Sequence, residues 1–215
     1  FDIDKPFAKT SDVHGAEVIV DFTFAEIVME NLQAAASLGI PVVEGTTGWQ
    51  EGGDEVKNIK NLTMLSSPNF SIGVYVFTKI ASYAAKLINP LGLYDCYLHE
   101  WHHSGKADSP SGTAKSLAKV LLDGFDNKEY LLFETCHQKI DPKALHVTST
   151  RAGRFPGTHD IGFDSDADLI QLKHQAHGRR GFAYGAVRAA EWLVGKTGLF
   201  TMDDFMQSIM DVTIN

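Results

Sequence analysis

The residues best suited to chemistry lie at positions 99–114, which read His-Glu-Trp-His-His-Ser-Gly-Lys-Ala-Asp-Ser-Pro-Ser-Gly-Thr-Ala. Within eight positions they include His99, His102, His103 and Lys106. Histidine exchanges protons near neutral pH and lysine carries a positive charge, so proton donors stand beside a cation. A Pro-Ser-Gly-Thr turn then opens an alanine-rich helix pattern, and the free N–H groups of a helix start favour an anion. The stretch therefore predicts proton transfer to a small anionic molecule.

The same stretch also matches the H-E-x-x-H pattern of zinc proteases, from His99 to His103. That pattern binds zinc only on a helix, where positions i and i+4 share a face. Residues 94–101 are rich in aromatic side chains and lie between turn-forming residues, which indicates a strand. On a strand, positions i and i+4 lie roughly 13 Å apart, too far for one metal ion. We therefore expect no metal here, although stoichiometric zinc in a metal analysis would support the protease alternative.

A strand at this position arranges the candidate side chains on two faces. Glu100 and His102 point one way and His103 points the other. The Ser-Gly pair that follows ends the strand, so the chain can turn and bring Lys106 back beside the histidines. Ser111 is then a plausible N-cap for the next helix. A polar loop before a capped helix, without any ligand, is the alternative interpretation.

The first turn of that helix provides candidate anion ligands. Gly112 and Thr113 would present backbone N–H groups at the positive end of the helix dipole. With His102, His103 and Lys106, they could converge on one carboxylate or phosphate.

The composition is typical of a globular protein. The 215 residues are 44% hydrophobic and 21% charged, enough for one large domain or two small ones. The net charge of −8 argues against a general nucleic-acid binder, so anions must meet local basic clusters, at residues 102–106 and 173–180. Two cysteines are too few for a disulfide scaffold. No apolar run approaches about 18 residues and no signal peptide is visible, so we expect a cytoplasmic protein.

The first 70 residues alternate between strand and helix patterns. Residues 17–21 form a short buried-strand pattern, Thr23 can cap a helix that ends at Gly39, and residues 40–44 form the next strand. A strand, a crossover helix and a second strand indicate a parallel sheet. Such sheets bind ligands beyond the carboxyl ends of their strands.

Polar loops follow these predicted strands. Asp21-Phe22-Thr23 follows the first strand, and the candidate cofactor-binding residues follow the next two: Gly45, Thr46, Thr47, Ser67, Pro68, Asn69 and Phe70. Each loop alone could be an ordinary turn or cap. Their shared position at successive strand ends favours a binding role.

The middle of the chain has a different pattern. A long helix is expected over residues 72–87, and strands without intervening helices follow at residues 131–133, 145–151, 159–163 and 169–176. Gly153, Pro156 and Gly157 indicate hairpin turns, and helices return over residues 184–194 and 203–210. The middle is therefore predicted to be an α+β domain with a mixed or antiparallel sheet. Arg151 and His159 are expected to serve sheet hydrogen bonding or an interface contact, while Arg179 could reach a cofactor or pair with an acid.

Six segments together resemble one enzyme family, that of 4-hydroxy-tetrahydrodipicolinate reductase. The central segment is His102-His103-x-x-Lys106-x-Asp108-x-Pro110-Ser111-Gly112-Thr113-Ala114, in which Ser109 replaces the usual alanine. The other segments, in the family's order, are Val20-Asp21-Phe22-Thr23, Gly45-Thr46-Thr47-Gly48, Pro68-Asn69-Phe70-Ser71-Ile72-Gly73, Arg151-x-Gly153 with Gly157-x-His159, and Arg179-x-x-Phe182-Ala183-x-Gly185-Ala186. The resemblance covers nearly the whole chain.

The resemblance implies an NADH- or NADPH-dependent oxidoreductase of the diaminopimelate route to lysine. It would dehydrate 4-hydroxy-tetrahydrodipicolinate and reduce its ring to tetrahydrodipicolinate. His102 and Lys106 match the family's proton-donor positions, and His103, Gly112 and Thr113 match positions that hold a substrate carboxylate. Substrate carboxylates would keep the lysine cationic, while the histidine would titrate near neutrality.

The resemblance also implies an architecture. The fold would be α/β, with a partial Rossmann-like parallel-sheet nucleotide domain and an α+β substrate domain with a mixed sheet. Residues 1–70 and 186–215 would form the nucleotide domain, and residues 71–185 the substrate and oligomerisation domain. The loops Gly45-Thr46-Thr47 and Ser67 to Phe70 would lie along the nicotinamide, and the open face of the middle sheet would form a homotetramer.

The glycine-rich phosphate turn that opens many dinucleotide folds is not found in the sequence. We therefore expect these 215 residues to bind dinucleotide poorly, and the choice between NADH and NADPH stays open. The alternative function is a non-catalytic oligomer that binds dicarboxylates. Dipicolinate binding without NADH oxidation would distinguish the two.

Overall fold

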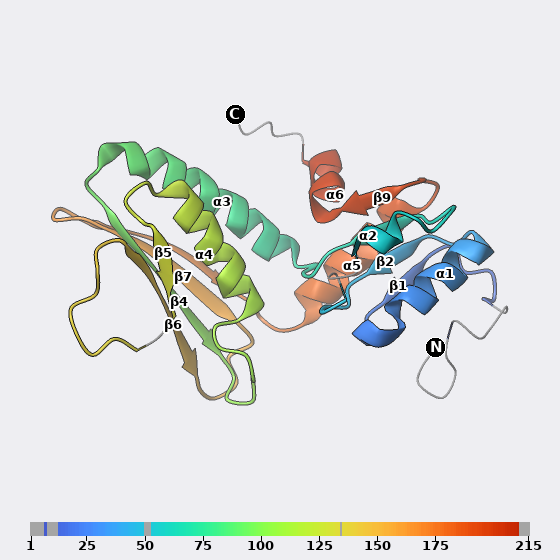
Figure 1. Ribbon diagram of the computed structural model, residues 1–215, viewed down its shortest axis with the longest axis horizontal. Coiled ribbons are helices and arrows are strands. Elements are labelled where there is room, and N and C mark those ends of the chain that lie inside the picture. The colour runs from blue at the N-terminus through green and yellow to red at the C-terminus, as the bar shows by residue number, and fades with distance from the viewer. Residues whose placement is uncertain (1–6, 8–12, 50–52, 134, 211–215) are drawn as a thin grey trace. The chain divides into compact units, whose positions relative to one another are not determined.

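The computed structural model describes residues 7, 13–49, 53–133 and 135–210 (Figure 1). It divides the chain into two compact units. The first unit comprises Phe1–Ser71 with Phe182–Asn215, and the second comprises Ile72–Gly181.

A parallel sheet of four strands forms the centre of the first unit, in the order β1-β2-β3-β9. The strands are β1 (Ile19–Asp21), β2 (Val42–Glu44), β3 (Met64–Ser66) and β9 (Leu199–Thr201). The helices of this part of the chain are α1 (Val28–Leu38), α2 (Gly53–Val56), α5 (Arg180–Leu193) and α6 (Met202–Ile209). The predicted parallel sheet is confirmed, although β9 was not predicted.

The start of α1 differs from the prediction that Thr23 caps this helix. The Asp21 carboxylate accepts hydrogen bonds from the Thr23 backbone N–H (2.9 Å) and from Asn31 Nδ2 (2.8 Å). The chain then makes a 3₁₀ turn at Ala25–Ile27 before α1 begins, and Ile27 holds the N-cap position. The cap prediction is wrong, because this turn separates Thr23 from the first residue of α1. Gly39, at φ 68°, ends the helix as predicted.

The second unit contains a mixed sheet of five strands in the order β5-β6-β4-β7-β8. Its strands are β4 (Asp95–His102), β5 (Tyr130–Leu132), β6 (Ala144–Arg151), β7 (Thr158–Asp164) and β8 (Leu169–Gln175). β4 is central, parallel to β6 and antiparallel to β7. The predicted mixed sheet is therefore confirmed. The turn predicted at residues 153–157 is not a hairpin, because it joins β6 and β7 across β4. The hairpin of this sheet joins β7 and β8.

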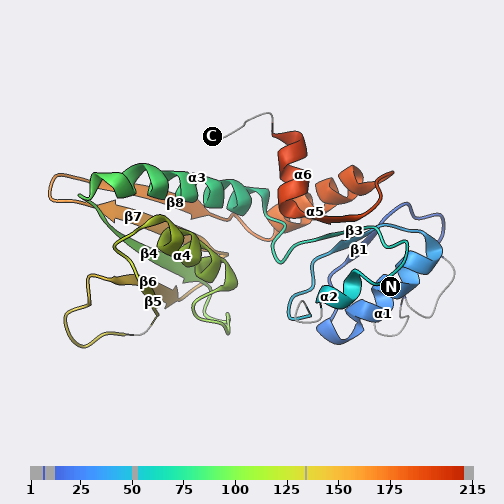
Figure 2. The same cartoon turned by 45° about the horizontal axis from the view of Figure 1, so that its top comes forward.

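Two helices, α3 (Ile72–Ile88) and α4 (Gly112–Gly124), lie side by side on one face of this sheet (Figures 1 and 2). A 3₁₀ turn at Asn89–Leu91 follows α3, which ends where the sequence predicts. The core between helices and sheet includes Phe77, Ala81, Leu117, Leu121 and Phe163. Cys96 is buried in the same core, and this burial raises the pKa of its thiol to about 12. Among the described residues, no helix is long and apolar enough to span a membrane.

Candidate active site

The histidine-rich segment lies on the central strand of the second unit. Along β4 the residues alternate, and Leu98, Glu100 and His102 face the buried side. His99 faces the other side, where its ring nitrogens contact the hydroxyl groups of Thr148 and Thr150. The predicted strand and its alternation are confirmed. A zinc helix is excluded, because His99 lies on a strand and not on a helical face shared with His103.

The helix start predicted at Ser111 is also confirmed. The Ser111 side chain accepts a hydrogen bond from the Ala114 backbone N–H (3.1 Å), and α4 begins at Gly112. This N-cap places Gly112 and Thr113 in the first turn, where the helix dipole favours an anion. The candidate carboxylate ligands therefore occupy the position at which a helix binds negative charge.

Lys106 lies in the loop between β4 and α4. Its backbone N–H donates to the His103 carbonyl (3.1 Å), so the chain turns as expected after the strand. The Lys106 ammonium contacts Asp108 Oδ1 at 2.6 Å. Hydrogen bonding to Lys106 lowers the pKa of Asp108, with a smaller contribution from the Gly112 backbone N–H. An internal carboxylate thus lies between two of the predicted anion ligands.

His102 is buried beside a carboxylate. Its Nδ1 lies 3.1 Å from Glu100 Oε2. Burial lowers the pKa of His102 to about 4; the Glu100 charge opposes this shift, whereas His159, Lys106 and Arg151 add to it. The expectation that His102 titrates near neutrality is therefore wrong for this structure, because burial disfavours the imidazolium. His102 is neutral at pH 7 when no further anion is near.

Glu100 is the most connected polar residue of the site and is fully buried. Its Oε1 accepts hydrogen bonds from the Ser111 backbone N–H (2.8 Å), Ser149 Oγ (2.9 Å) and Arg151 Nη2 (2.7 Å). Its Oε2 accepts from Ser111 Oγ and lies 3.6 Å from His159 Nε2. Burial alone would raise the pKa of Glu100, but hydrogen bonds from His159, Ser111 and Arg151 outweigh it and hold the pKa well below its usual range.

Sequence reasoning missed the role of Glu100 and gave Arg151 and His159 only sheet or interface roles. The structure places both of these residues against the Glu100 carboxylate, next to His102. A signal was present, because strand alternation put Glu100 on the same face as His102. A charged side chain on a buried face needs a partner of opposite charge. The sequence did not show which strands would supply that partner.

Glu100, His102 and His159 have ligand atoms within 4.8 Å of one another, the spacing of a metal site. The donor set does not fit one well. Both oxygens of Glu100 already accept hydrogen bonds, and Arg151 supplies the positive charge that a metal would bring. We therefore describe this group as a hydrogen-bonded cluster, not a metal centre.

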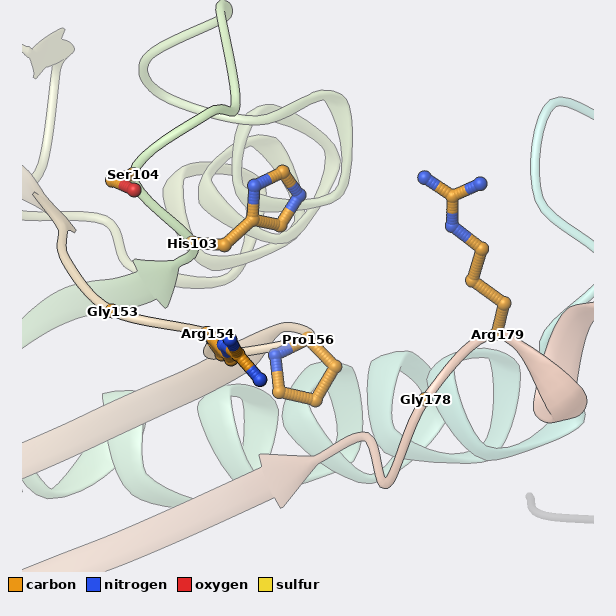
Figure 3. A pocket seen from close by; sticks show the side chains of 7 residues that line it. All are labelled: His103, Ser104, Gly153, Arg154, Pro156, Gly178 and Arg179. Carbon is orange, nitrogen blue, oxygen red and sulfur yellow. The ribbon is translucent and has the colours of Figure 1, made fainter.

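A cavity of about 430 Å³ lies among the segments that follow β4, β6 and β8 (Figure 3). Its walls carry His103 and two arginines and no acidic residue; the lining residues are His103, Ser104, Gly153, Arg154, Pro156, Gly178 and Arg179. In Figure 3 the His103 ring and the Arg179 side chain stand on two sides of the space. Of the five predicted catalytic and substrate residues, His103 is the one that lines it. A cavity with these walls suits an anionic ligand.

In the first unit, the predicted cofactor loops follow β2 and β3 at the carboxyl edge of the parallel sheet. The Gly45 N–H donates to the Asp21 carbonyl (2.9 Å), and the Ser67 N–H donates to the Glu44 carbonyl (3.1 Å). A Cβ at Gly45 would lie 2.2 Å from the Phe22 ring, so a side chain there would require this exposed ring to move. These contacts place the two loops side by side at the edge where α/β sheets bind nucleotides.

Several backbone and side-chain groups of these loops already make local contacts. The Thr46 N–H donates to Glu44 Oε1 (2.6 Å), and Ser67 Oγ donates to the Asn69 carbonyl (2.9 Å). Phe70 is fully buried, with its ring edge-on to Phe22. Pro68 lies in the loop after β3, and Thr47 lies in the loop after β2.

Comparisons with known proteins agree with this arrangement. Two family models match, described as dihydrodipicolinate reductase, N-terminus, over residues 3–70, and dihydrodipicolinate reductase, C-terminus, over residues 73–206. The 4-hydroxy-tetrahydrodipicolinate reductase of Archaeoglobus fulgidus is 41% identical over 201 residues, which cover 89% of this chain and 76% of the relative. The reductase of the same name from Christiangramia forsetii is 36% identical over 197 residues, which cover 90% of this chain and 80% of the relative.

A solved structure gives the same result. The chain resembles the dipicolinate-bound dihydrodipicolinate reductase from Paenisporosarcina sp. TG-14, with a TM-score of 0.68 and 25% identity. The match covers 86% of this chain and 71% of the other. The resemblance and the α/β fold class inferred from sequence are both confirmed. The chain belongs to the dihydrodipicolinate reductase family.

Proposed function

We propose that the protein reduces 4-hydroxy-tetrahydrodipicolinate to tetrahydrodipicolinate with NADH or NADPH, in the diaminopimelate route of lysine biosynthesis. The observation that carries the proposal is the joint position of His102 and the capped start of α4, linked through Glu100. This arrangement puts a buried proton donor next to a site for a carboxylate. The named relatives carry the same activity in their names.

The substrate would be held by its two carboxylates. The N–H groups of Gly112 and Thr113 and the side chain of His103 are the proposed ligands of one carboxylate. Arg179 lines the cavity next to His103 and is available for the second. The solved relative with bound dipicolinate supports a dicarboxylate of this size.

Proton transfer is the task of His102 and Lys106. The nicotinamide cofactor, when bound, supplies the hydride that reduces the ring. The ring then needs a proton, and a donor held within hydrogen-bonding distance typically accelerates such a step by about 10²–10⁴. Carboxylates next to His102 would oppose the effect of burial and favour its protonated form. Lys106 is the second donor and would exchange its contact with Asp108 for one with the substrate.

The cofactor is assigned to residues 1–70 with 186–215 and the substrate to residues 71–185. The loops Gly45 to Thr47 and Ser67 to Phe70 are the proposed contacts of the nicotinamide half. The carboxyl edge of a parallel sheet is the position at which such sheets bind dinucleotides. Neither loop distinguishes NADH from NADPH.

Assembly and location belong to the same proposal. The second sheet leaves Leu169 and Ile170 of β8 exposed, and a homotetramer would cover such a surface. A cytoplasmic location suits the two free cysteines.

The test is oxidation of NADH or NADPH in the presence of the substrate, at cofactor concentrations high enough for a weakly bound dinucleotide, with Lys106→Ala as the critical variant. We expect turnover to fall by a factor of about 10² or more. Unfolding should be little affected, because Lys106 makes a partly exposed ion pair. Lys115→Ala, on the exposed side of α4, is the matched control and should keep full turnover.

Near-normal turnover of Lys106→Ala would contradict the role given to this lysine. Dipicolinate binding by the wild-type protein, with no oxidation of either cofactor, would instead favour the non-catalytic dicarboxylate-binding oligomer.

A further inference from the structure

Glu100 makes contacts that the reaction described above has not used. Its two oxygens contact six groups from four parts of the second unit: the backbone and side chain of Ser111 at the start of α4, Ser149 and Arg151 on β6, His102 on β4 and His159 on β7. The side chain is fully buried, so water does not replace any of these partners. A buried carboxylate held by this many donors stays ionised and acts only as a hydrogen-bond acceptor.

An acceptor beside His102 determines which ring nitrogen carries the proton. Glu100 Oε2 lies 3.1 Å from Nδ1, but this contact lacks the alignment of a linear hydrogen bond. The interaction is therefore mainly electrostatic. A lone pair on Nδ1 would face an anionic oxygen, whereas an N–H there is attracted to it. The carboxylate thus favours the tautomer with hydrogen on Nδ1.

The other ring nitrogen, Nε2, faces Gly157. This glycine has φ +141°, and a Cβ there would lie 3.1 Å from His102 Nε2. The absence of a side chain leaves room beside Nε2. Since Nδ1 lies next to the Glu100 carboxylate, Nε2 is the nitrogen through which His102 can exchange a proton with a ligand.

Glu100 also fixes the start of α4. It accepts from both the backbone N–H and the hydroxyl group of Ser111, and that same hydroxyl caps the helix through the Ala114 N–H. Arg151 extends the connection, because its Nη2 donates to Glu100 and to the Asp108 carbonyl in the preceding loop. One carboxylate therefore joins the imidazole to the helix turn that carries Gly112 and Thr113.

We propose that Glu100 is a positioning residue. It holds the Nδ1 proton on His102 and stabilises the imidazolium when Nε2 also carries a proton. It also keeps this imidazole in a fixed position relative to the carboxylate-binding turn of α4. The inference rests on the proton-donor role proposed for His102.

Among the titratable groups around His102, Glu100 is the group whose charge stabilises the imidazolium. The titratable groups that face its ring are Glu100 on the same strand, Lys106 in the following loop, Arg151 on β6 and His159 on β7. Glu100 is the anion among them. If its charge is removed, Lys106 and Arg151 remain and both disfavour a second cation.

The test compares Glu100→Gln with Ser149→Ala, which removes a neutral donor from the same carboxylate. The tautomer of His102 is read by long-range ¹H–¹⁵N NMR of histidine-labelled protein without substrate. We expect hydrogen on Nδ1 in the wild type and in Ser149→Ala. In Glu100→Gln the amide N–H₂ can face Nδ1, so hydrogen should move to Nε2.

Kinetics provide the second readout. In the wild type, kcat should fall as pH rises through the pKa of His102 in the substrate complex, because the donor loses its proton. Glu100→Gln should shift this fall to lower pH by about one unit or more and lower kcat by about tenfold or more at neutral pH. In Ser149→Ala, the pH at which kcat falls should be the same as in the wild type.

Hydrogen on Nε2 in the wild type would overturn the inference, and this measurement needs no variant to fold. An unchanged tautomer and pH profile in a folded Glu100→Gln would overturn it as well. If the wild type oxidises no cofactor, the proposed function fails, whereas the ligand-free tautomer still tests Glu100.

Discussion

Two buried glutamates have opposite pKa shifts, although burial acts on both in the same direction. Burial raises the pKa of Glu44 to about 7, and the negative charge of Asp21 on the neighbouring strand adds to it, against hydrogen bonds from Thr46. Glu100 has Arg151 and several donors, which outweigh its burial and lower its pKa. The difference lies in the partners, which come from other strands. The sequence pattern predicted both strands but did not show which residues of other strands would contact each glutamate.

Glu44 should therefore make stability depend on pH. A carboxyl with a raised folded-state pKa stabilises the fold fully below its ordinary value of 4.5, and the stabilisation is lost as pH rises through about 7. At about 1.4 kcal/mol per pKa unit, the loss approaches roughly 3 kcal/mol. Glu44→Gln removes this dependence. Urea unfolding should show the variant more stable than wild type by roughly 3 kcal/mol at alkaline pH, and similar to it in acid.

Glu17→Gln, at an exposed position before β1, is the control and should change stability by the same small amount at both pH values. A pH-independent difference between wild type and Glu44→Gln would show that folding does not shift the pKa of Glu44, and the prediction would then be wrong.

Among secondary-structure elements, the long periodic ones were predictable and the short ones were not. Residues 72–87 gave a clear helical period, and α3 spans Ile72–Ile88. β9 has three residues, too few to show a period, yet it forms the edge of the parallel sheet next to β3. The hairpin expected at residues 153–157 is wrong for a related reason. Turn residues indicate that the chain reverses, but they do not show that another strand, β4, lies between the two strands that the turn joins.

The contact between α3 and α4 leads to a prediction at this scale. A Cβ at Gly124 would lie 2.7 Å from the Cβ of Ala85, so the helices approach more closely than two alanines allow. Gly124→Ala should cost about 1–3 kcal/mol from overpacking, partly offset by about 1 kcal/mol of helix propensity. Adding Ala85→Gly should recover part of the loss. Thermal unfolding of the single and double variants measures both effects, and a stabilised Gly124→Ala would show that the helices separate at no cost.

For the whole molecule, charge and chain organisation separate the binding tasks. The net charge of −8 repels a dianion, so binding of the proposed dicarboxylate would depend on the local cations Arg154 and Arg179 and on the start of α4. All of these, with His102 and Lys106, lie in the second unit, Ile72–Gly181. The candidate cofactor loops lie in the first. Sequence motifs predicted roles for His102, Lys106 and the two loops, but did not predict the cluster of Glu100, Arg151 and His159, since its members lie on three separate strands.

A protein consisting of residues 72–181 should therefore bind dipicolinate but not NADH or NADPH. The second unit contains a complete hydrophobic core, built from both of its helices and its sheet, which is the requirement for folding alone. Circular dichroism would establish that the helices form, and calorimetric titration would then compare dipicolinate with each cofactor. Dipicolinate should bind with an affinity within about tenfold of the whole chain, because the proposed anion ligands are all present. A folded second unit that fails to bind dipicolinate would place an essential carboxylate ligand in the first unit, and the assignment of substrate binding to one unit would then be wrong.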